Sequence, residues 1–107
     1  MSEERTGDEL LAFFEALANR HRLRMVALLY EDRKYVSQLA RELGLSRPLV
    51  YMHLNRLEEA KIVTSEREIS ESGKAMNYYA LEPFYEEITA AYIARATETL
   101  SNERKKG

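Results

Sequence analysis

Cysteine is absent from the 107 residues, which excludes disulfide bonds, thiolate metal sites and cysteine nucleophiles. Long apolar runs are missing too, because the longest, Met25–Tyr30, is far shorter than the roughly 20 residues that cross a bilayer. The first nine residues, MSEERTGDE, are acidic and lack the basic and apolar regions of a secretory signal. We therefore expect a cytoplasmic protein that does not enter a membrane.

Motifs of enzymes are also missing. Glycine occurs four times and forms no glycine-rich phosphate-binding loop. The only histidines, His21 and His53, do not stand beside a paired acid and nucleophile. Catalytic groups can converge from distant positions, but nothing in this sequence points to such a set. We expect a protein that is not an enzyme and that binds no cofactor.

Charge is distributed unevenly along the chain, although the net charge is only −2. Residues 19–57 contain eight basic and three acidic residues, a net charge of +5, and the remainder carries −7. A field segregated in this way can steer a polyanion to one face of the protein. The alternative is a set of solvated helix faces whose charges happen to cluster.

Two helices are predicted at the N-terminal end. Thr6 and Glu9 have the spacing of a capping box, which predicts a first helix over about 7–18. Asn19 is expected to cap a second helix. The residues expected on the inner faces are Leu10, Phe13, Phe14 and Leu17 in the first helix and Leu23, Val26, Ala27 and Tyr30 in the second.

A helix-turn-helix is predicted over about 36–60. Its first helix covers about 36–43, and Gly44 follows, where a left-handed backbone favours glycine. Its second helix begins within one residue of Arg47. Pro48 is tolerated there because the first N–H groups of a helix have no intrahelical partner.

The cap of this second helix has two candidates. Ser46 can accept a hydrogen bond from the N–H of Leu49. Arg47 can be the cap instead, because the residue before a proline resists the α region.

The pattern becomes β-like after residue 61. The runs IVTSEREI and AMNYYAL, separated by SESGK, predict a hairpin over about 62–81. Pro83 is expected to open a last helix over about 83–101. The predicted fold is mainly α with a small β-hairpin wing. It is a single winged helix-turn-helix domain, residues 1–107, with additional N- and C-terminal helices.

The second helix of the helix-turn-helix has two unlike faces. Val50, Leu54 and Leu57 share one face, with His53 at its edge, and the stretch from Arg47 to Arg56 contains no acid. Donors and apolar groups near a helix N-terminus can reach base edges in DNA. The candidate DNA contacts are Gln38, Ser46, Arg47, Pro48, Tyr51, Met52, Asn55 and Arg56, together with Arg67 and Lys74 in the wing.

Residues of this helix also have structural interpretations. Tyr51 and Met52 can pack under the wing or in a dimer contact. Arg56 can pair with Glu59, an i, i+3 neighbour, for a few tenths of a kcal/mol. His53 is interpreted as a packing or phosphate-bonding histidine rather than a metal ligand.

In the wing, Arg67 and Lys74 are offset by three glutamates, so a minor-groove contact and a solvated hairpin are both open. A winged helix can also serve as a protein-interaction module, because a fold does not determine a function. Such a module would tolerate acids on the second helix of its helix-turn-helix, and this chain has none from Arg47 to Arg56.

These motifs together resemble the arsenic-repressor-like (ArsR-type) winged-helix transcription regulators. LANRHRLRMVALL at 17–29 is similar to their second-helix signature, YVSQLARELGLSRPLVYMHLNRLEEAKIV at 35–63 to their helix-turn-helix, and GKAMNYYAL at 73–81 to their wing. The resemblance covers nearly the whole chain. It implies a homodimer, held mainly by the first and last helices, that binds a palindromic operator in double-stranded DNA as a repressor.

The dimer has separate support, because an apolar stripe on a terminal helix needs a partner surface. The candidate interface residues are Leu10, Phe13 and Phe14 in the first helix and Tyr85, Ile88, Tyr92 and Ala96 in the last. The alternative is that both helices fold back on their own core.

Departures from the family are informative. Metal-sensing members carry a pair of cysteines where this chain has Tyr35 and Ser37, and other members bind zinc through histidines that residues 83–107 lack. We therefore expect no metal site, and the effector is left open. Lys61 stands where the family usually has glycine, and a left-handed backbone there would cost about 1 kcal/mol.

Overall fold

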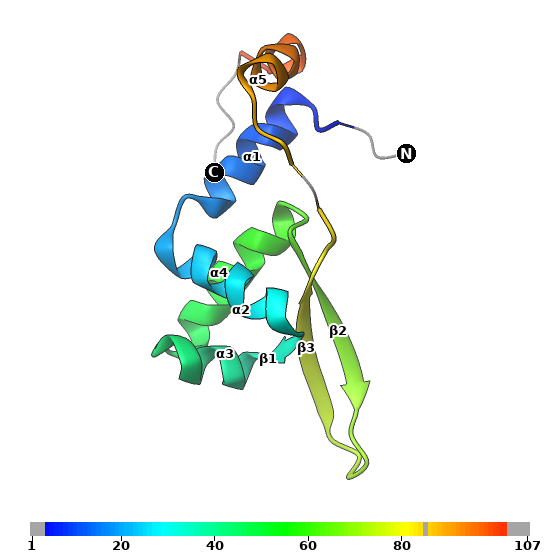
Figure 1. Cartoon of the computed structure of the whole chain (residues 1–107). Helices are drawn as coiled ribbons and strands as arrows, with labels where there is room; N and C mark the ends of the chain where they lie inside the picture. The colour runs from blue at the N-terminus through cyan, green and yellow to red at the C-terminus, as the bar shows by residue number, and fades with distance from the viewer. Residues whose placement is uncertain (1–3, 85, 103–107) are drawn as a thin grey trace.

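The computed structural model describes residues 4–84 and 86–102 of the chain. These residues form α1 (Gly7–Leu17), α2 (Arg20–Glu31), β1 (Lys34–Tyr35), α3 (Val36–Leu43), α4 (Arg47–Glu59), β2 (Val63–Ile69), β3 (Ala75–Leu81), α5 (Ala90–Ala96) and the 3-10 turn η1 (Thr97–Thr99). The β2–β3 hairpin and α5 lie at opposite ends of the molecule (Figure 1). The predicted fold class, mainly α with a hairpin wing, is confirmed.

The predicted caps begin the first two helices. Thr6 Oγ1 accepts a hydrogen bond from the N–H of Glu9 at 3.2 Å, and Glu9 Oε1 accepts one from the N–H of Thr6 at 2.9 Å. Asn19 Oδ1 accepts from the N–H groups of His21 and Arg22 at 2.9 and 3.1 Å. Side chains therefore satisfy backbone donors that a helix leaves without partners at its start.

The inner face of α2 differs from the predicted one. Met25 and Leu29 are buried, whereas Leu23 is 54% exposed and Tyr30 is 82% exposed. Of the four residues predicted to face inward, only Val26 packs against the core, and Leu23, Ala27 and Tyr30 face solvent. Because the run from Met25 to Tyr30 is apolar on every side of the helix, its periodicity does not select a face. The contacts of α2 with α1, α3, α4 and β3 select it instead.

The sheet has three antiparallel strands in the order β1–β3–β2. Tyr35 of β1 and Glu66 of β2 both lie opposite Tyr78 of β3. β1 was not predicted, because a strand of two residues is too short to show an alternating pattern. It ties the start of α3 to the wing.

The predicted last helix over 83–101 is wrong in extent, since α5 covers only Ala90–Ala96. Thr89 is the actual cap, and its Oγ1 accepts a hydrogen bond from the N–H of Tyr92 at 3.0 Å. Pro83 lies in an irregular segment that follows β3. In that segment, the ring of Phe84 packs edge-on against Phe13 at a centroid distance of 5.4 Å. Tertiary contacts therefore outweigh the helix-start signal of the proline.

The turn after α4 keeps its left-handed residue although that residue is lysine. Lys61 has φ of 63°. Its N–H donates to the carbonyl oxygen of Glu58 at 2.9 Å, and the N–H of Ile62 donates to that of Leu57 at 2.9 Å. This pair of bonds is a Schellman motif, in which glycine normally takes the left-handed position. The expected strain at Lys61 is therefore present.

No helix within the described residues is long and apolar enough to cross a membrane.

Candidate nucleic-acid interface

α4 begins at a serine cap directly before a proline. Ser46 Oγ accepts a hydrogen bond from the N–H of Leu49 at 3.4 Å, so Ser46 rather than Arg47 is the cap. Pro48 occupies a first-turn position where an N–H would have no intrahelical partner. Ser46, Arg47 and Pro48 are all exposed. The first turn of α4 is therefore open to a ligand.

The two sides of α4 differ in burial. Val50, Leu54 and Leu57 are fully buried, as predicted. Opposite them, Tyr51 is 39% exposed and Met52 is 48% exposed. The exposed residues of this side, called here the α4 surface, are Arg47, Pro48, Leu49, Tyr51, Met52, Asn55 and Arg56.

No acidic side chain interrupts the α4 surface, and Glu58 and Glu59 follow only in the last turn. None of the ion pairs among residues 4–84 and 86–102 involves Arg47 or Arg56. The pairing of Arg56 with Glu59 is thus not formed in this part of the chain. Both guanidinium groups are available to a phosphate or a base edge.

His53 lies on the buried side of α4 and is 6% exposed. Its Nδ1 accepts a hydrogen bond from Nη1 of Arg22 at 2.9 Å, and Nε of Arg22 donates to the carbonyl oxygen of Ala16 at 2.6 Å. Burial, followed by the charges of Arg22 and His21, lowers the pKa of His53. The side chain of His53 therefore packs α4 against α2.

Gln38 has a structural use in α3. Its Oε1 accepts a hydrogen bond from the N–H of Tyr35 at 2.8 Å, at the start of the helix. The side chain is half-buried. Gln38 therefore helps to begin α3, and its contact with DNA stays a prediction.

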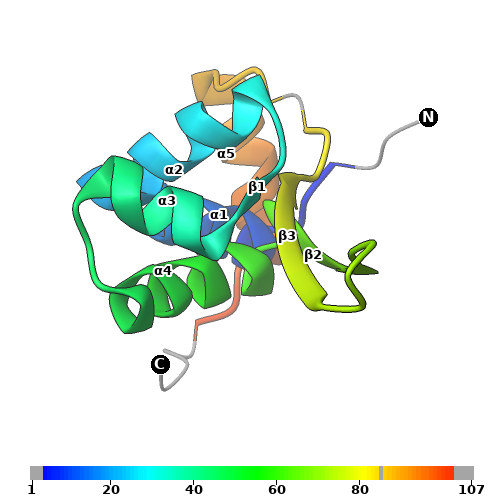
Figure 2. The same ribbon diagram turned by 90° about the horizontal axis from the view of Figure 1, so that it is seen from below.

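One face of the wing is directed toward α4. The register places Arg67 opposite Asn77 and Ser65 opposite Tyr79, so these four side chains share a face. Tyr79 is buried, and Ser65 Oγ donates a hydrogen bond to Glu58 Oε2 of α4 at 3.2 Å. α3 and α4 lie side by side, with the hairpin next to them (Figure 2). Arg67 therefore lies on the face of the wing that is directed toward α4.

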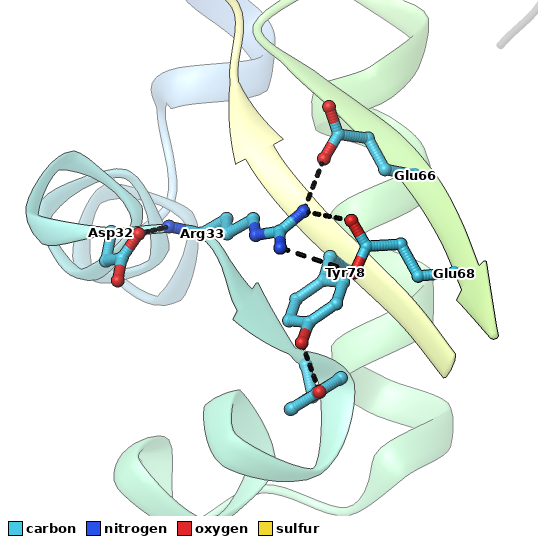
Figure 3. Close-up of polar contacts among 6 residues, drawn as sticks. Asp32, Arg33, Glu66, Glu68 and Tyr78 are labelled. Atoms are coloured by element: carbon cyan, nitrogen blue, oxygen red, sulfur yellow. Dashed lines mark hydrogen bonds and ion pairs between the residues drawn. The ribbon is translucent and has the colours of Figure 1, made fainter. Parts of the chain in front are cut away.

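The opposite face of the wing carries Glu66 and Glu68, and Arg33 binds both of them (Figure 3). Nη1 of Arg33 lies 3.1 Å from Glu66 Oε1 and 2.8 Å from Glu68 Oε2, and Nη2 lies 3.3 Å from Glu68 Oε1. These bonds, first to Glu68 and then to Glu66, raise the pKa of the Arg33 guanidinium. The guanidinium also lies 3.9 Å above the ring of Tyr78. Tyr78 in turn stacks on Tyr35, with a hydrogen bond between the two hydroxyl groups.

Lys74, the second wing candidate, lies at the hairpin turn and is exposed. Its backbone N–H donates to Ser70 Oγ at 3.1 Å, and Gly73 beside it has φ of 84°, a value that favours glycine. The tight turn leaves the lysine side chain at the tip of the wing.

The candidate dimer residues fall into two groups. Leu10, Phe13, Tyr92 and Ala96 are buried within the chain itself, where α1 meets α5, so these two helices do fold onto each other. Phe14 is half-buried and Ile88 is 47% exposed. Tyr85 lies outside the described residues.

An apolar hollow of about 150 Å³ remains open between α1 and α5. It is lined by Gly7, Leu10, Leu11, Phe14, Ile93, Ala96, Thr97 and Leu100. Leu11 and Ile93 at its edge are exposed large apolar residues. The hollow and its edge are called here the α1–α5 surface.

The pattern described as "Bacterial regulatory protein, arsR family" matches residues 19–65, which run from the cap of α2 into β2. An uncharacterized HTH-type transcriptional regulator of Methanocaldococcus jannaschii is 40% identical over 70 residues, which are 65% of this chain and 73% of the relative. The chain belongs to the arsR family of transcriptional regulators. Members of this family regulate transcription and are not enzymes.

Two solved structures are similar to this arsR-family protein. HlyU from Vibrio cholerae N16961 is 21% identical, with a TM-score of 0.63 over 90% of this chain and 92% of its own. The winged helix-turn-helix DNA-binding domain Mb0332 from Mycobacterium bovis is 24% identical, with a TM-score of 0.62 over 82% of this chain and 70% of its own. Both confirm the fold. Together with its family, this fold makes the protein a transcriptional regulator with a winged helix-turn-helix DNA-binding domain, and α3 and α4 are its helix-turn-helix.

Tyr35 and Ser37 stand where, by the family resemblance, metal-sensing arsR-family proteins carry cysteines. Tyr35 instead stacks on Tyr78, with ring centroids 4.0 Å apart. In the part of the chain that the structure describes, no group of three or more histidine, aspartate or glutamate side chains could hold a metal ion.

Three residues of α4 and of the wing region were not among the candidate residues from the sequence. Leu49, which helical spacing places on a flank of α4 beside Arg56, is exposed but was not among the candidate DNA contacts. Asn77 lies opposite Arg67, which only the strand register reveals. Arg33 left no sequence signal, because its partners Glu66 and Glu68 stand 33 and 35 residues away.

Proposed function

We propose that the protein is a homodimeric repressor in the cytoplasm that places α4 in the major groove of a palindromic operator. The observation that carries this proposal is the α4 surface, which combines two arginines, an amide and apolar side chains without an acid, and neither arginine forms an ion pair within residues 4–84 and 86–102. A repressor of this kind acts by occupying its operator.

The chemistry of the α4 surface suits base edges. Arg47 and Arg56 can donate to guanine or to phosphate, and Asn55 can pair with adenine through its amide. Tyr51 and Met52 offer apolar surface to a thymine methyl group. The helix N-terminus at Ser46 adds its dipole and backbone donors, which favour a phosphate.

A dimer would bury the α1–α5 surface. This surface exposes apolar side chains beside an apolar hollow, and such surfaces mark interaction sites. A homodimer is also the state given for the Mycobacterium bovis domain. Two copies joined in this way would present two α4 helices to two half-sites.

The oligomeric state tests this part of the proposal. Leu11→Glu places a charge in the α1–α5 surface at a side chain that is exposed in the single chain, so folding should persist. We expect a dimer for the wild type and a monomer for Leu11→Glu in light scattering coupled to size-exclusion chromatography. Leu23→Glu, at an equally exposed leucine of α2, is the control and should stay dimeric. A monomeric wild type would overturn the dimer.

A gel-shift titration of the protein on the DNA upstream of its own gene tests the proposed operator binding. We expect tight binding to a palindrome whose half-sites lie about 34 Å apart. Affinity should fall steeply with salt, because arginines replace counterions on phosphates. Weak binding that ignores sequence at physiological salt would contradict the proposal.

Charge reversal separates DNA binding from a protein-interaction role. Arg47→Glu combined with Arg56→Glu should abolish operator binding, because both arginines are exposed and unpaired within the described residues. The far-ultraviolet circular dichroism spectrum should not change. A protein-interaction module would keep its partner after this change.

A further inference from the structure

The wing carries acids that would oppose DNA binding if they were free. Glu66 and Glu68 occupy adjacent positions on one face of β2, since alternate residues of a strand share a face. Their side chains are 50% and 47% exposed. Carboxylates that come close to DNA phosphates are repelled by them.

Arg33 pairs with both acids from outside the wing, so its single positive charge offsets one of their two negative charges. It lies between α2 and β1, and its Nη1 is shared between Glu66 and Glu68 while Nη2 makes a second bond to Glu68. A single guanidinium therefore contacts two carboxylates of a different segment. The forked geometry of arginine permits this arrangement, which a lysine ammonium matches poorly.

Arg33 also restrains the direction of the wing. Its guanidinium lies 3.9 Å above the ring of Tyr78, and that ring stacks on Tyr35 with centroids 4.0 Å apart. Tyr35 stands directly before α3. A chain of contacts thus joins the wing, through Arg33 and two tyrosines, to the helix-turn-helix (Figure 3).

The cluster lies on the far face of the wing from α4. Tyr79 and Ser65 fix the near face through burial and a hydrogen bond to α4, and Arg67 and Asn77 continue that face toward the tip. The polar groups suited to DNA are on one face, and the acids with their counter-ion are on the other. Exposed ion pairs add little stability, so stability alone does not account for this cluster.

We propose that Arg33 is a positioning residue for DNA binding. By holding Glu66 and Glu68 and stacking on Tyr78, it halves the negative charge of these two positions and turns the face with Arg67 and Asn77 toward DNA. This role rests on the proposed operator binding, and it makes the wing a second contact beside α4.

Affinities of five proteins for one operator duplex test the role. Arg33→Ala should bind about tenfold more weakly than the wild type, since the wing then carries one more uncompensated negative charge near the DNA and loses the contacts that hold its direction. Arg33→Ala combined with Glu66→Gln and Glu68→Gln should recover most of that loss, and Glu66→Gln with Glu68→Gln alone should bind at least as tightly as the wild type. Arg33→Lys, which keeps the charge and loses the forked bonds, should fall between the wild type and Arg33→Ala.

The chain offers a matched control in Arg95. It also pairs with a carboxylate, Glu4 at 2.7 Å, and lies 5.8 Å from the ring of Tyr92, but it belongs to α5 at the end of the molecule opposite the hairpin. Arg95→Ala should bind the operator like the wild type. Circular dichroism should show every variant folded.

The operator affinities distinguish failure of the Arg33 role from failure of the proposed function. If Arg33→Ala binds like the wild type, or if the glutamine changes fail to rescue it, Arg33 has no role in DNA binding or only a structural one, and the inference is overturned while the repressor stands. If the wild type itself shows no sequence-specific binding, the proposed function fails and the inference fails with it.

Discussion

Nη1 of Arg22 lies 2.9 Å from Nδ1 of His53, which joins α2 to the buried side of the recognition helix. A guanidinium can only donate, so the imidazole must accept at Nδ1 and carry its proton on Nε2. The contact therefore requires neutral His53. Protonation would place a second positive charge against Arg22, beside His21 and near Arg56, the groups whose charges act on this pair.

Stability should therefore fall in mild acid. The pKa of His53 is lowered in the folded protein, first by burial and then by Arg22 and His21. Below the unfolded-state pKa of about 6.5, the unfolded chain binds a proton that the folded chain resists, until the pH reaches the folded pKa. The free energy of unfolding should drop as pH falls through this window, by at most about 1.4 kcal/mol per pH unit from this group. Urea denaturation at several pH values measures it.

His53→Gln separates this effect from other titrations. Glutamine keeps an acceptor for Arg22 but does not titrate. The pH dependence below about 6.5 should become shallower in His53→Gln than in the wild type. Identical slopes in the two proteins would show that His53 does not cause the loss.

The two sides of α4 should separate stability from recognition. Asn55→Ala, on the exposed side, should weaken operator binding by about 1–3 kcal/mol, and the loss should map to one base pair of each half-site. The proposed function pairs this amide with adenine through two hydrogen bonds, which alanine cannot form. The unfolding free energy of Asn55→Ala should change by no more than about 0.5 kcal/mol. Leu54→Ala is the counterpart on the fully buried side, and it should lower stability by about 2–5 kcal/mol. Equal effects of the two changes on stability would contradict the division of α4 into these sides.

Lys61→Gly should stabilise the fold by about 1 kcal/mol, because glycine adopts the left-handed backbone without the Cβ strain of lysine. Lys61→Ala is the control, since alanine loses the charge and keeps the strain. Denaturant midpoints compare the two. If alanine stabilises as much as glycine, the charge rather than the backbone is responsible.

Gly7→Ala should loosen α5 from α1. A Cβ at this position would lie 2.3 Å from the carbonyl oxygen of Ala96 and 2.7 Å from the backbone nitrogen of Leu100, so the backbone must shift. The N–H of Gly7 also donates to Thr99 Oγ1 at 2.7 Å. We expect a loss of about 1–3 kcal/mol in unfolding free energy and a weaker dimer.

Ala12→Ser, at an exposed position of α1, is the control for Gly7→Ala and should leave both properties unchanged. An unchanged dimer and stability in Gly7→Ala would show that α5 does not depend on this close approach.

Local signals predicted the helix starts well. Thr6, Asn19 and Ser46 each cap a helix in the structure, since a cap depends only on residues within three or four positions. The left-handed backbone of Lys61 was expected from the family resemblance instead, because the family usually has glycine at this position. The buried side of α4 was also predictable, because Val50, Leu54 and Leu57 recur at helical spacing.

Features that depend on distant parts of the chain were not predictable. The predicted inner face of α2 was wrong, because the apolar run has no polar side and packing against other elements selects the buried face. Pro83 signalled a helix that the contact of Phe84 with Phe13 prevents. Arg33 is the extreme case, because its role exists only once the sheet brings Glu66 and Glu68 beside it.

Selection of bound sequences from a random pool of double-stranded DNA tests the central claim, that the α4 surface reads an operator. The wild type should enrich a palindrome with half-sites about 34 Å apart, and Asn55→Ala should lose preference at one position of each half-site. A wild-type pool that shows no enriched sequence at physiological salt would contradict the claim.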